Sequence, residues 1–163
     1  MVRRHTVLFV FIAVFTALGM IAAAADMVGG GGQTPLSAAL GFNVHSDLNG
    51  QLNYNADPNG PYAGFSAHCS SWSSYTTRTV TGGYLQVIVN GTCTDQDGNV
   101  LGIHAGFTDR GTPGQGLPDL VCIQFFLGHV LLIHDHGPMQ TGNITIHSDP
   151  NNAAGTMAEM LSS

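Results

Sequence analysis

The sequence predicts an all-β fold: a single-domain antiparallel β-sandwich of about eight to nine short strands, preceded by a signal peptide. Its 163 residues suit one compact domain. The chain has no lysine and one glutamate, Glu159, although helical proteins use these residues on their exposed faces. The 22 glycines, together with many asparagines, serines and threonines, are typical of strands and turns.

The first 25 residues have the pattern of a signal peptide. Arg3 and Arg4 form a basic start, Val7–Ile21 is apolar, and Ala22–Ala25 supplies the small residues that a signal peptidase requires. We expect cleavage after Ala25 and a secreted, extracellular protein. The alternative is that the segment is retained as a membrane anchor.

Cleavage would leave a strongly acidic mature chain. The mature chain would contain two basic residues, Arg78 and Arg110, and ten acidic residues, which gives a formal charge of −8. Such a surface repels phosphate backbones and anionic lipids. We therefore expect no nucleic-acid partner and no membrane association after cleavage.

The mature chain divides into three parts. Residues 26–35, which include four consecutive glycines, are predicted to form a flexible leader. Residues 36–148 form the β-sandwich domain, and residues 149–163 form a C-terminal tail.

Short apolar or alternating runs with turn residues between them predict the strands of the domain. They are Ala38–His45, Gln51–Asn55, Gly64–Ser71, Thr76–Val80, Tyr84–Thr94, Val100–Thr108, Leu120–Phe126, His129–Asp135 and Asn143–His147. The turns contain Asn49–Gly50, Gly82–Gly83 and Asp97–Asn99, which tolerate positive φ angles. A two-residue alternation within these strands predicts one buried face and one exposed face.

Three cysteines predict one disulfide and one free thiol in an oxidising compartment. Three pairings are open to the sequence. In the two-residue alternation of their strands, Cys69 and Cys93 lie on the same face as apolar neighbours and therefore point towards the core. Around Cys122 the residues of both faces are apolar, so its direction is undecided. We expect a disulfide between Cys69 and Cys93, with Cys122 buried and inert.

Five short motifs follow one another along the domain: Gly41–Val44, Gly50–Tyr54, Val89–Gly91, Asp109–Gly114 and Gly142–His147. In this order, from about Leu36 to Ser148, they resemble a small secreted bacterial β-domain found beside choice-of-anchor modules. The resemblance implies an all-β extracellular module without assigned chemistry. Thr94–Gly98 departs from the pattern as an insertion, and the usual C-terminal anchor signal is missing, so a freely secreted or partner-held protein is as consistent as an anchored one.

His134 and His136 are the strongest candidates for metal ligands. Histidines two residues apart on a strand project from the same face and could share a zinc or copper ion. A third ligand is needed, and His147 is the obvious candidate. Simple hairpin pairing of the last two strands places His147 on the opposite face, which favours exposed or hydrogen-bonded histidines over a metal site.

Two acidic loops offer oxygen ligands. Asp95 and Asp97 alternate as in a calcium loop, but without a closing glutamate, so an ordinary turn is favoured. Asp109 and Asp119 bracket a Gly/Pro-rich loop, where they could hold an ion. A structural clamp with a salt bridge to Arg110 is the simpler interpretation.

The sequence therefore favours a non-catalytic extracellular module with a role in adhesion, matrix or surface assembly. Its partner would be an extracellular protein or glycan, and we expect no cofactor. A strip of aromatic side chains could contact a glycan, although packing in the core explains them more simply: Tyr54, Tyr62, Trp72 and Tyr75. The alternative is a secreted metal-binding protein or metalloenzyme that uses the His134/His136 pair, with zinc, copper or calcium as the metal.

Overall fold

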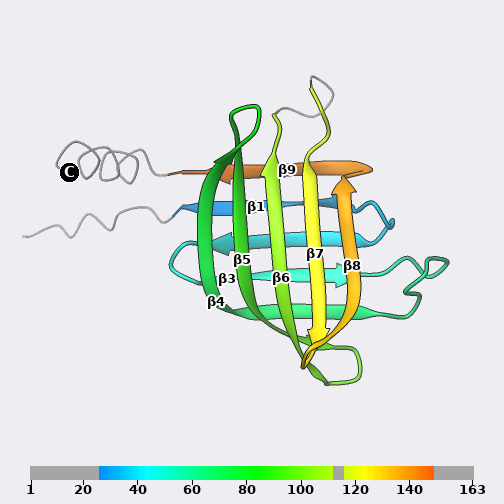
Figure 1. Cartoon of the computed structure of the whole chain (residues 1–163). Coiled ribbons are helices and arrows are strands. Elements are labelled where there is room, and N and C mark those ends of the chain that lie inside the picture. Colours follow the sequence, from blue (N-terminus) through cyan, green and yellow to red (C-terminus); the bar gives the residue numbers. More distant parts are fainter. Residues whose placement is uncertain (1–25, 112–115, 149–163) are drawn as a thin grey trace, which may run out of the picture.

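The computed structural model describes residues 26–111 and 116–148, and this part of the chain is all β (Figure 1). Its strands are β1 (Met27–Gln33), β2 (Ala39–His45), β3 (Gly50–Asn55), β4 (Ser66–Val80), β5 (Tyr84–Asp95), β6 (Val100–Asp109), β7 (Leu120–Leu127), β8 (Val130–Pro138) and β9 (Thr141–His147). No helix within the described ranges is long and apolar enough to cross a membrane. The predicted signal peptide (1–25) and tail (149–163) lie outside the described residues.

All nine strands belong to one antiparallel sheet with the order β8-β7-β6-β5-β4-β3-β2-β1-β9. The sheet curls, so that β1, β2, β3 and β9 run across β5 to β8 (Figure 1). The predicted antiparallel all-β class is thus confirmed. A sandwich of two separate sheets is not confirmed, because every described strand is hydrogen-bonded into the same sheet.

The long strand β4 carries the sheet from one half to the other. Its pairing with β5 shifts register between Cys69 and Ser71 and again between Trp72 and Ser74. Such bulges bend a strand and increase its twist without ending it. The prediction of two separate strands, Gly64–Ser71 and Thr76–Val80, is therefore wrong, because the irregular segment between them is a bend within one strand.

The prediction of a flexible leader at residues 26–35 is also wrong. Met27–Gln33 form β1, which pairs with β2 on one side and with β9 on the other. A Cβ atom at Gly30 would overlap the carbonyl oxygen of Asn143, and one at Gly32 would overlap that of Thr141. The glycine run is thus needed for the close approach of β9, rather than for flexibility.

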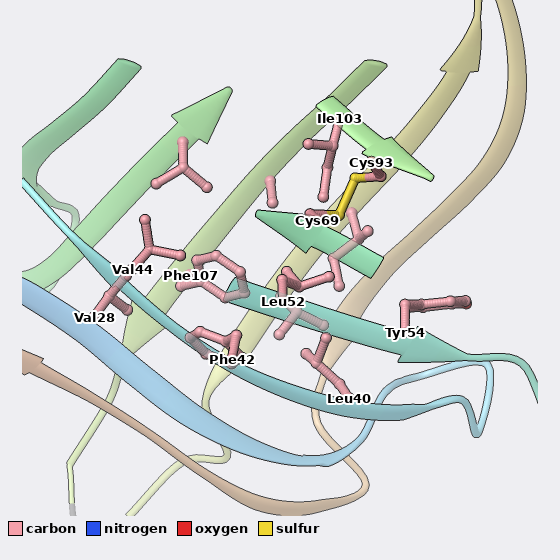
Figure 2. Packing of buried hydrophobic residues seen from close by; sticks show 14 of the residues in the cluster. Val28, Leu40, Phe42, Val44, Leu52, Tyr54, Cys69, Cys93, Ile103 and Phe107 are labelled. Carbon is pink, nitrogen blue, oxygen red and sulfur yellow. A yellow bond between two sulfur atoms is a disulfide. The ribbon is translucent and has the colours of Figure 1, made fainter. Parts of the chain in front are cut away.

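The core lies between the two crossing halves of the sheet. Alternate residues of β6, from Leu101 to Phe107, point inward and are buried, as the alternation predicts. Figure 2 shows Phe42 of β2 facing Phe107 of β6, and their stacked rings have centroids 4.1 Å apart. Contacts of this kind bury the apolar faces of both halves against each other.

The predicted disulfide between Cys69 and Cys93 is confirmed (Figure 2). The two residues are direct partners in the β4–β5 pairing, and both are buried. Cys122 is a free thiol, as predicted. It is only half-buried and its parity is opposite to that of the core residues of β7, so the expectation of a buried Cys122 is wrong.

Candidate functional site

The candidate site lies on the outer face of β5 to β8, which we define as the face pointing away from the core. One row of cross-strand neighbours crosses it: Ser74, Asn90, His104, Gln124 and His134. The amide of Asn90 donates to Ser74 Oγ at 2.7 Å, and Asn90 Oδ1 accepts from His104 Nδ1 at 2.7 Å. His104 is thereby held in place by its neighbours.

The predicted pair His134 and His136 does share this outer face. The two rings are stacked with centroids 4.4 Å apart. Cys122, which the sequence analysis did not connect with them, is the direct partner of His136, and its Sγ lies 3.9 Å from His134 Nε2. Burial, with a smaller contribution from the charge of Asp135, raises the pKa of the Cys122 thiol.

Cys122, His134 and His136 do not form a metal site in the arrangement that the structure shows. No group of three or more histidine, cysteine or acidic residues in the described ranges has the arrangement to hold a metal ion. The predicted pairing of the last two strands is wrong: β8 and β9 are the opposite edges of the sheet, and His147 pairs with Met27 of β1. His147 is thereby excluded as a neighbour of His136 within the sheet.

The loop with Asp95 and Asp97 is a hairpin turn between β5 and β6, as favoured above. Asp95 accepts hydrogen bonds from the backbone N–H groups of Asp97 and Asn99, at 2.9 and 2.8 Å, and from the Asn99 amide at 2.8 Å. These bonds, above all the one from the Asn99 side chain, lower the pKa of Asp95. Since the carboxylate oxygens already serve the turn, the geometry does not favour calcium binding here.

Asp109 and Asp119 act as the predicted clamp, but through backbone groups. Asp119 accepts from the N–H of Arg110 at 2.7 Å and from that of Ile144 at 2.6 Å. Asp109 accepts from the N–H of Ile146 at 3.2 Å. The two carboxylates thus satisfy backbone N–H groups of the edge strand β9 and tie this strand to the ends of β6 and β7. The expected salt bridge to Arg110 is not seen among the described residues.

Asp135 is a buried carboxylate that the sequence analysis did not single out. It accepts hydrogen bonds from the hydroxyl of Thr34, from the hydroxyl of Tyr54 at 3.0 Å and from the N–H of Leu36 at 3.2 Å. Burial, followed by the nearby Asp135 charge, raises the pKa of Tyr54 far above its ordinary value. The cluster joins edge strand β8 to β3 and to the β1–β2 turn, so its role is structural closure.

The aromatic strip considered above does not form. Tyr54 and Trp72 are core residues, and the Trp72 ring N–H donates to the carbonyl of Gly50 at 3.0 Å. Tyr62 and Tyr75 are half-buried against the core. These four side chains therefore support the fold, in agreement with the simpler interpretation.

A groove on the outer face is a candidate for ligand binding. Two adjoining pockets, with volumes of about 310 and 260 Å³, share Gln86, Thr108 and Leu120 in their walls. We call their union the outer groove. Its first end is lined by Arg78, Tyr84 and Arg110, and its second end by Gly106, Cys122 and His136.

The sheet explains why this groove exists. Gly106 has no side chain on the outer face, while its partner Cys122 and the neighbouring rows carry larger side chains. A Cβ at Gly106 would meet the Cβ of Cys122 at 3.8 Å, an ordinary contact, so the hollow is open rather than filled. The sequence did not connect the side chains at the first end of the groove with one another. The two-residue spacing of Tyr84 and Gln86 did indicate that these two lie on the same face of their strand.

No family model, curated protein or solved structure matches the chain. The resemblance to the β-domain found beside choice-of-anchor modules therefore stays a prediction.

Proposed function

We propose that the chain is a secreted, non-catalytic binding module that holds an extracellular glycan in the outer groove, in a role in adhesion, matrix or surface assembly. The outer groove is the observation that carries the proposal. Its walls present an amide from Gln86 and an imidazole from His136, which suit the hydroxyl groups of sugars. The Cys69–Cys93 disulfide is consistent with export, because disulfides persist in oxidising compartments.

The test is retention of the protein on cell-wall and polysaccharide fractions, with the groove open or blocked. Gly106→Leu places a side chain in the groove at a position where a Cβ is tolerated. Gly102→Leu is the matched control, because Gly102 lies on the same strand and face, a Cβ there meets Phe126 at 3.9 Å, and the residue does not line the groove. We expect the first variant to lose retention and the second to keep it. Equal retention of both variants, or none by the wild type, would contradict the proposal.

A second candidate function is binding of a transition metal by the His134/His136 pair, beside which Cys122 lies. The 3.9 Å separation of Cys122 Sγ and His134 Nε2 favours it, since thiolate and imidazole are ligands for zinc and copper. Elemental analysis after incubation with zinc tests it on the wild type and on His134→Ala. Stoichiometric zinc that is lost in the variant supports this function, and zinc that is absent or unchanged in the variant rejects it.

A further inference from the structure

The two arginines of the described chain lie together at the first end of the outer groove. Arg78, Gln86 and Thr108 are successive neighbours across β4, β5 and β6. Tyr84 and Arg110 lie two residues beyond this row on the same side, and all five residues line the pocket of about 310 Å³. The described ranges contain eight aspartates, two arginines and no lysine. Every lysine or arginine side chain of these ranges therefore lines this pocket.

Neither guanidinium is neutralised by a carboxylate, since no ion pair of Arg78 or Arg110 is seen among the described residues. Arg78 Nε donates to Gln86 Oε1 at 2.8 Å, and Gln86 Nε2 donates to Thr108 Oγ1 at 2.9 Å. This chain of hydrogen bonds orients Arg78 through its Nε, and its terminal Nη groups make no hydrogen bond within the described residues. An oriented, exposed guanidinium is well placed to bind a carboxylate with two parallel bonds.

Arg110 is held differently, and only in part. Its Cζ lies 5.6 Å from the centroid of the Tyr84 ring, and its Nη1 donates to the carbonyl of Pro118 at 3.3 Å. Its Nε is buried and has no hydrogen-bond partner. A buried donor without an acceptor is unfavourable. The structure thus keeps a positive, incompletely satisfied group beside the pocket.

We propose that this pocket binds the carboxylate of an acidic sugar, a uronic acid residue within a polysaccharide. The inference rests on the proposed function and names its ligand class. Two arginines supply the charge for one isolated carboxylate, while the excess of aspartates elsewhere repels densely charged polyanions. Gln86 lies beside Arg78 in the wall of the pocket, and the groove continues from there towards His136 for the next sugar residue.

Calorimetric titration with an oligosaccharide that carries a single galacturonate residue, and with the same oligosaccharide methyl-esterified to remove its charge, tests the proposal. Loss of one charge-assisted contact should weaken binding about tenfold or more. We expect this loss for the methyl ester on the wild type and for the acidic oligosaccharide on Arg78→Gln. Arg110→Gln should behave likewise, and because Arg78 is exposed, Arg78→Gln remains informative if the Arg110 variant does not fold.

Asn55→Asp is the matched charge control. It changes the net charge by the same amount as Arg78→Gln, at an exposed position of β3 that does not line the groove. We expect its affinity to remain close to that of the wild type. Equal binding of the esterified and acidic oligosaccharides, unchanged affinity in Arg78→Gln, or tighter binding of an oligoaspartate peptide would overturn the inference. If neutral glycans are still retained in a manner sensitive to Gly106→Leu, only the uronate inference fails; if no glycan is retained, the proposed function fails as well.

Discussion

Removing the hydroxyl of Tyr54 tests whether the Asp135 cluster holds the curled sheet together. Both side chains are fully buried, and their hydrogen bond is 3.0 Å long. Tyr54→Phe keeps the ring, which packs edge-on against Phe125 with centroids 5.3 Å apart, and removes one donor to a buried carboxylate. Hydrogen bonds to charged groups contribute about 1.5–3 kcal/mol, so we expect the free energy of unfolding to fall by about 2 kcal/mol. For a domain of this size the melting temperature should fall by about 8 °C.

Urea unfolding followed by circular dichroism measures this loss, and the slope of the free energy against urea concentration should not change. Tyr62→Phe is the matched control, because the Tyr62 side chain is half-buried against the core and its hydroxyl makes no hydrogen bond within the described residues. A double-mutant cycle of Tyr54→Phe with Asp135→Asn should give a coupling energy of about 1 kcal/mol or more. A Tyr54→Phe protein within about 0.5 kcal/mol of the wild type would refute the reasoning, as would an equal loss in Tyr62→Phe.

Three further predictions concern the disulfide, the free thiol and one glycine. Replacing Cys69 and Cys93 together by alanine should lower the free energy of unfolding by about 3.5 kcal/mol, because the disulfide joins residues 24 positions apart. Cys122→Ala should change this free energy far less. Equal losses in denaturant unfolding would contradict the prediction. Since burial raises the pKa of Cys122, native protein should react with iodoacetamide near neutral pH more slowly than unfolded protein does, and equal rates would reject the assignment. Gly142→Ala should lower the melting temperature more than Gly98→Ala does. Both glycines have positive φ angles, 95° and 83°, but only at Gly142 would a Cβ also overlap the backbone of β1. Similar losses in thermal unfolding would show that the φ angle alone decides.

The elements that could be predicted from the sequence are those that depend on neighbours along the chain. A two-residue alternation is a local signal, and it assigned the faces of β5 and β6 and the inward direction of Cys69 and Cys93. The hairpin turn around Asp95 follows from the residues within it. In each case the energetically decisive contacts lie within one strand, one hairpin or one pair of adjacent strands.

The curl of the sheet could not be predicted in this way. Thr34 and Asp135 are 101 residues apart in the chain, and Tyr54 and Asp135 are 81 apart, so no local pattern connects them. The glycines of β1 were misinterpreted for a related reason. Taken alone, consecutive glycines are flexible and disfavoured in strands, and only the close approach of β9 makes them necessary.

The candidate site depends both on the local alternation of each strand and on the long-range pairing of the sheet. Its positive charge is explained by the contacts that the acidic residues make elsewhere. Most described aspartates accept hydrogen bonds from backbone N–H groups, in turns or at the closure of the sheet: Asp47, Asp57, Asp95, Asp109, Asp119 and Asp135. A carboxylate engaged with backbone donors in a turn or at a strand edge is fixed there by the fold and is not available to a distant arginine. Arg78 and Arg110 are consequently left without carboxylate partners among the described residues, on the one face where a groove adjoins them. The same acidic residues that close the sheet thus leave two positive charges for a ligand.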